Sequence, residues 1–72
     1  MDFDAIRKET VEWMAQLALK PGWIDYAREM VMRYDKDTTG VFKGISKEVS
    51  QRVKELKNEL LTNYSIQIII IL

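Results

Sequence analysis

The segment YDKDTTGVF, residues 34–42, carries oxygen-bearing side chains at the spacing of a calcium-binding EF-hand loop. Asp35, Asp37 and Thr39 occupy loop positions 1, 3 and 5. Gly40 occupies position 6, where the backbone of such a loop turns sharply. Because calcium is bound by oxygen ligands from successive loop positions, these three side chains are the candidate metal ligands of the chain.

The match fails at the end of the loop. In a functional loop, position 12 is a glutamate that binds calcium through both carboxylate oxygens, but in this chain position 12 is Ser46. Position 9, another ligand position, is Lys43. Losing that glutamate removes two oxygen ligands and one negative charge, so the calcium affinity should fall severely. Turn-forming and helix-capping residues explain the same segment without a metal. We therefore expect no metal or other cofactor, and a degenerate calcium binder stays open as an alternative.

The composition argues against catalysis. The 72 residues include no cysteine and no histidine, which excludes disulfides, thiolate metal sites and the commonest general base. No nucleophile–base pair and no constellation of carboxylates is visible in the sequence. We therefore expect a protein that is not an enzyme.

A row of lysines could contact phosphate groups. They recur within a narrow angular sector of a predicted helix: Lys43, Lys47, Lys54 and Lys57. However, the eleven basic and eleven acidic residues cancel, so no overall charge attracts nucleic acid. An accessory role in nucleic-acid binding is therefore an alternative and not the main expectation.

Apolar periodicity predicts an all-α domain of three helices, over about residues 4–19, 23–35 and 42–63. Pro21 and Gly22 should end the first helix and force a sharp turn into the second. The apolar residues of the third helix repeat almost as a heptad. Gly44 near its start costs helix stability, so a start at Ser46 stays open. The predicted core consists of Phe3, Ile6, Trp13, Leu17, Trp23, Met30, Tyr34, Phe42, Ile45, Val49, Val53, Leu56 and Leu60.

The polar faces of the first two helices follow from the same periodicity. Lys8, Glu12 and Ala15 should lie opposite the apolar face of the first helix. Ile24 and Met32 fall on the polar side of the second helix, where they could extend a contact surface.

The last segment, SIQIIIIL at residues 65–72, should form an apolar tail after a helical domain at residues 1–64. Four consecutive isoleucines favour a strand, because β-branching restricts their side chains in a helix. No other segment resembles a strand, so its pairing partner would be another copy or another protein. Alternatively the third helix continues, with Leu61, Tyr64, Ile68 and Ile71 on one face.

These features together predict a small interaction domain that self-associates and binds a protein partner not identifiable from the sequence. The predicted partner-binding residues are Met32, Ile66, Ile68, Ile69, Ile70, Ile71 and Leu72. The longest apolar run is far too short to span a bilayer, so we expect no membrane contact. The N-terminal segment MDFDAIRKE is too charged for a signal peptide, so we expect a cytoplasmic protein.

One stretch carries a resemblance to known proteins. KPGWIDYAREMV followed by DTTGVFKGI, within residues 20–45, resembles a segment of small phage- and prophage-encoded proteins. The residues that carry it are Trp23, Tyr26, Ala27, Gly40 and Gly44. The resemblance implies a phage or prophage setting and no particular activity. Because small phage proteins often bind and block host proteins, it favours the interaction hypothesis.

Overall fold

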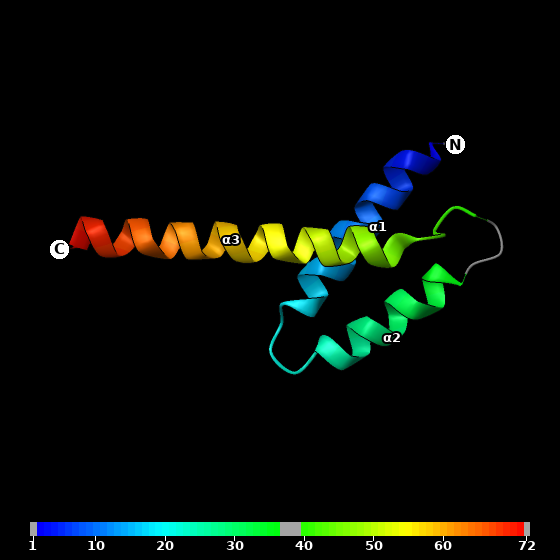
Figure 1. The fold of residues 1–72 in the computed structure, drawn as a ribbon, viewed down its shortest axis with the longest axis horizontal. Helices are drawn as coiled ribbons and strands as arrows, with labels where there is room; N and C mark the ends of the chain where they lie inside the picture. The colour runs from blue at the N-terminus through cyan, green and yellow to red at the C-terminus, as the bar shows by residue number, and fades with distance from the viewer. Residues whose placement is uncertain (1, 37–39, 72) are drawn as a thin grey trace.

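Three helices make up the part of the chain that the structure describes, which confirms the predicted all-α fold (Figure 1). They are α1 (Phe3–Ala18), α2 (Ile24–Asp35) and α3 (Ile45–Ile71). The computed structural model describes residues 2–36 and 40–71, and for residues 61–71 it describes the backbone alone. No strand occurs among the described residues.

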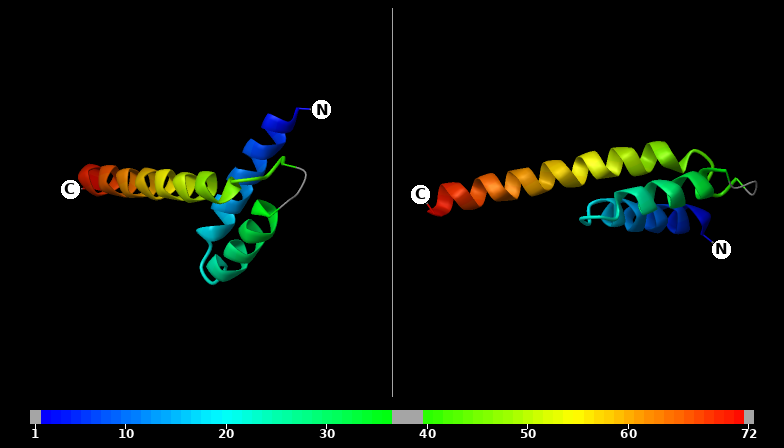
Figure 2. Two further views of the ribbon diagram at one scale, coloured as in Figure 1. Left: turned by 45° about the vertical axis from the view of Figure 1, so that its right-hand side comes forward. Right: turned by 90° about the horizontal axis from the view of Figure 1, so that it is seen from below.

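The helices form two layers. α1 and α2 run antiparallel as a hairpin, and α3 crosses over α1 as the second layer (Figures 1 and 2). The C-terminal half of α3 then continues away from the hairpin, which makes the molecule elongated, at 53 × 27 × 16 Å. The fold therefore presents a long helix of which only one half is packed.

Local residue chemistry sets the helix starts. The Asp2 carboxylate caps α1 by accepting a hydrogen bond from the backbone N–H of Ala5 at 3.1 Å. α3 begins at Ile45, later than the approximate start at residue 42 and next to the alternative start at Ser46. Gly44 has a φ of 76°, and a residue in that left-handed region cannot belong to a right-handed helix.

The third helix also extends beyond the approximate end at residue 63. α3 continues through Ile71, so the chain adopts the helical alternative for this segment and forms no strand there. Neither proline nor glycine interrupts the sequence between residues 45 and 71. A helix satisfies its backbone hydrogen bonds internally, whereas a lone strand would leave them unpaired. Leu72 lies outside the described residues.

The core lies where α3 crosses the hairpin. Its centre consists of Val11, Met14, Ile45 and Val49, and partly buried side chains pack around it: Met30, Val31, Tyr34, Phe42 and Val53. The rings of Tyr34 and Phe42 lie 5.1 Å apart, in a tilted arrangement typical of packed aromatic pairs. The predicted burial of Leu17, Ile45, Val49 and Leu56 is confirmed.

Four residues predicted in the core are exposed, and one predicted on the surface is buried. Phe3, Trp13, Trp23 and Leu60 retain between 46% and 60% of their exposure. In contrast, Ala15 is completely buried. It lies one helical turn after Val11, on the side of α1 that carries Glu12, which bonds to α3. Covering by both α2 and α3 therefore widens the buried sector of α1 beyond the predicted face.

Candidate interaction surface

The packed face of α3 loses its cover one turn before residue 60. We define the inner face as Ile45, Val49, Val53 and Leu56, which contact the hairpin side of the fold. Leu56 is 8% exposed, whereas Leu60, one turn later on the same side of the helix, is 60% exposed. The hairpin therefore covers α3 only as far as Leu56.

From this point α3 projects alone, as Figures 1 and 2 show. We call residues 60–71 the projecting segment, and at 1.5 Å per residue it is about 18 Å long. Its sequence contains no charged residue. The predicted partner-binding residues Ile66 and Ile68–Ile71 all belong to it, and the structure does not describe their side chains.

Met32, the other predicted partner-binding residue, is far from this segment along the fold. It is exposed on α2, one turn before that helix ends. The Ser46 hydroxyl donates a hydrogen bond to Asp35 Oδ2 at 3.1 Å, so the end of α2 lies beside the start of α3. Met32 and the projecting segment therefore belong to opposite ends of the molecule and do not form one surface.

Two arginines fix α3 across α1. Arg7 donates from Nη1 to the carbonyl oxygen of Val41 and from Nη2 to that of Lys43, both at 2.7 Å. Its Nε and Nη2 also donate to the Glu48 carboxylate at 2.8 to 3.1 Å. The hydrogen bond to Glu48 raises the pKa of Arg7 above its ordinary value. Arg7 thus ties the loop before α3, and the first turn of α3, to α1.

The second arginine joins the helices one turn further along. Arg52 Nε donates to Glu12 Oε2 at 2.6 Å, and Arg52 Nη1 donates to Glu55 Oε2 at 3.1 Å. The hydrogen bond from Arg52 holds the pKa of Glu12 below its ordinary value, and the same bond raises the pKa of Arg52. These ion pairs commit the inner side of α3 to α1 and leave other sides of the helix open.

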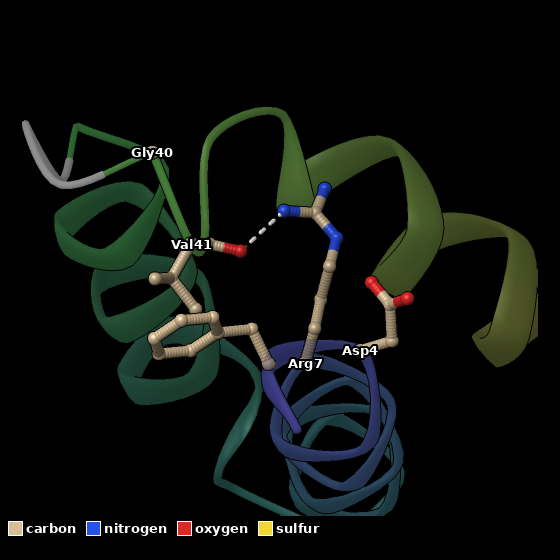
Figure 3. A pocket seen from close by; sticks show the side chains of 5 residues that line it. Asp4, Arg7, Gly40 and Val41 are labelled. Atoms are coloured by element: carbon tan, nitrogen blue, oxygen red, sulfur yellow. Dashed lines mark hydrogen bonds between the residues drawn. The ribbon is translucent and has the colours of Figure 1, made fainter. Parts of the chain in front are cut away.

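A surface hollow of about 820 Å³ lies beside the first of these arginines (Figure 3). Arg7 extends through it from α1 toward Val41, with Asp4 and Gly40 at its edge. Four of the five N–H groups of Arg7 already donate to protein oxygens. The hollow therefore offers a ligand little free hydrogen-bonding capacity and is best explained as the surface of a helix junction.

The two ends of the calcium-like loop lie side by side. Its positions 1 and 12 contact each other directly through the hydrogen bond from Ser46 to Asp35. Gly40 has the left-handed φ, 85°, that the turn requires. Asp37 and Thr39, the other candidate ligands, lie outside the described residues. Among residues that the structure describes, no three acidic, histidine or cysteine side chains gather as a metal site would require.

The four candidate phosphate-binding lysines are all exposed. Lys43 lies in the turn before α3, whereas Lys47, Lys54 and Lys57 lie on α3 itself. Their row on the helix follows the predicted spacing, and none forms an ion pair with another described residue. The row is thus a solvated cationic strip beside the inner face.

Sequence reasoning missed the two arginine clusters. Glu48 is 41 positions from Arg7, so no local pattern links them. A signal was present nevertheless, because Arg7 falls among the apolar positions of α1, and a charged residue there requires a partner.

Comparisons with known proteins give no relative for this chain: no family model, no curated protein and no solved structure matches it. The resemblance to phage-encoded proteins therefore stays a prediction. Across residues 2–36 and 40–71, no helix combines the length and apolar content needed to cross a bilayer.

Proposed function

We propose that this chain is a small protein–protein interaction domain that self-associates through the projecting segment of α3. The observation that supports it is the change from 8% to 60% exposure between Leu56 and Leu60, where an uncharged helical segment leaves the hairpin. Within the described part of the chain, no other helix runs alongside this segment (Figures 1 and 2).

The physical reason is twofold. An isolated helix of about 12 residues is marginal in water, because most helix stability in proteins comes from tertiary packing. A segment rich in isoleucine and leucine also gains about 1.5–3 kcal/mol for each such side chain that becomes fully buried. Packing against a partner would stabilise the helical conformation of the projecting segment and bury its apolar side chains, which the hairpin does not do.

A second copy of the chain is the partner that the sequence itself provides. Each copy carries the same uncharged segment, and a twofold pair buries identical surfaces against each other. The core of this 72-residue chain is small, and it contains no disulfide to support it. Association would therefore raise the free energy of unfolding of a domain whose own stability is small.

The test is the molar mass measured by light scattering at several concentrations. We expect the full chain to be a dimer and both a chain ending at Glu59 and the variant Ile68→Lys to be monomers. Met32→Lys is the matched control, since it places the same charge on an exposed apolar residue of α2, outside the projecting segment. This variant should remain a dimer. A full chain that stays monomeric at high micromolar concentration contradicts the proposal, as does a dimer that survives truncation.

A further inference from the structure

α3 carries a second row of residues beside its inner face. We call this the outer row, and its members follow one another in steps of three and four: Lys47, Ser50, Lys54, Lys57, Leu61, Tyr64, Ile68 and Ile71. Because α3 runs unbroken from Ile45 to Ile71, this spacing keeps them on one heptad row. At about 100° per residue, the row lies roughly 100° around the helix from the inner face.

The hairpin leaves the outer row free in the packed half of α3. Lys47, Ser50, Lys54 and Lys57 are all exposed, whereas the inner face is held against α1 by the Arg7–Glu48 and Glu12–Arg52 ion pairs. A partner helix aligned with α3 therefore meets the outer row and not the inner face.

The outer row changes character near residue 60. It is cationic up to Lys57 and uncharged from Leu61 onward. In a parallel, in-register pair, Lys47, Lys54 and Lys57 of both copies would face each other along the seam. Like charges at facing positions oppose association. In an antiparallel pair that overlaps only in the projecting segments, Leu61 of one copy lies opposite Ile71 of the other, and the lysines lie beyond the overlap.

We infer that the projecting segment pairs with that of a second copy in the antiparallel direction, and that the lysines of the outer row exclude the parallel pair. This inference rests on the proposed self-association and specifies its geometry. The two hairpins then lie at opposite ends of a short two-helix connection, and each lysine strip stays in solvent. The lysines therefore set the orientation of the dimer and need bind no phosphate.

The chain has no cysteine, so a single introduced cysteine allows a spin label at one chosen site. Gln51→Cys places the label on an exposed α3 position beside the outer row. The antiparallel pair separates the two labels by roughly 45 Å, since each lies about 15 residues from the centre of the overlap. A parallel pair brings them within about 20 Å, because packed helix axes lie about 8–10 Å apart and the two label side chains add to that spacing.

Gln67→Cys is the matched control, because it lies near the centre of the overlap and gives a separation under about 20 Å in either orientation. Electron paramagnetic resonance, with dipolar pulses for long distances and line broadening for short ones, measures both variants. We expect a short distance at position 67 and a long one at position 51. Short distances at both positions overturn the antiparallel geometry alone, whereas no interaction at position 67 overturns the self-association itself.

A second variant tests the role of the lysines. Lys54→Leu combined with Lys57→Leu, in the Gln51→Cys background, extends the uncharged row into the packed half of α3. We expect a new population with a distance under about 20 Å at position 51, since the parallel pair is no longer opposed. An unchanged long distance would show that the lysines do not set the orientation.

Discussion

Ala15 gives the sharpest test of how α1 is packed, because sequence periodicity places it in solvent and the structure buries it completely. Replacing it by leucine inserts three carbon atoms on the side of α1 that faces α3. Overpacking of this kind typically costs about 1–3 kcal/mol. In a domain of this size each kcal/mol lowers the melting temperature by about 4–8 °C. We therefore expect Ala15→Leu to lower Tm by roughly 5–20 °C.

The assay is thermal unfolding followed by far-ultraviolet circular dichroism at one fixed protein concentration, since association would otherwise shift Tm. Ala5→Leu is the matched control, because it makes the same substitution at an exposed position of the same helix. Its Tm should change by no more than a few degrees, since alanine and leucine differ little in helix propensity. Equal Tm values for the two variants would refute the described packing of α1 against α3.

Three further outcomes follow from the charged and polar groups. Calcium at millimolar concentration should leave Tm unchanged, because Ser46 stands where the loop needs a bidentate carboxylate, and a shift of several degrees would contradict this. Duplex DNA should bind weakly at physiological salt, whereas submicromolar binding with a steep salt dependence, lost on replacing Lys47 and Lys54 by glutamate, would favour a nucleic-acid role. The hydrogen bond from Arg52 holds the pKa of Glu12 below its ordinary value, so the ionised carboxylate stabilises the fold at neutral pH and loses this effect as the pH falls through the lowered pKa. Glu12→Gln should therefore flatten the loss of stability in acid, which pH-dependent chemical unfolding measures, and an unchanged acid profile would exclude this contribution.

The helices themselves were predictable because their signals are local. The apolar spacing of each helix and the Pro21–Gly22 pair are contained within short stretches of sequence. The burial of individual side chains was harder to predict from the sequence, since it depends on which neighbouring helices cover each face. Trp13 and Trp23 were predicted in the core, yet Trp13 keeps 46% of its exposure and Trp23, which precedes the first residue of α2, keeps 47%.

The candidate surface was predictable only in part. The isoleucine run at residues 68–71 pointed to the end of the chain, but its conformation stayed open, because β-branching favours a strand whereas the apolar spacing also fits a continued helix. A continuous α3 resolves this ambiguity and also reveals the outer row, since the heptad relation of Lys57 to Leu61 requires an unbroken helix. The arginine clusters depended on residues about 40 positions apart and could not be derived from local spacing.

A second copy should order and cover the projecting segment under the proposed self-association. This can be followed by amide hydrogen exchange of residues 60–71, measured by mass spectrometry across the concentration range in which light scattering detects association. We expect exchange in this segment to slow as the protein concentration rises, while exchange in the packed first half of α3 changes much less. Rapid exchange of residues 60–71 at every concentration, with the dimer present, would contradict the claim.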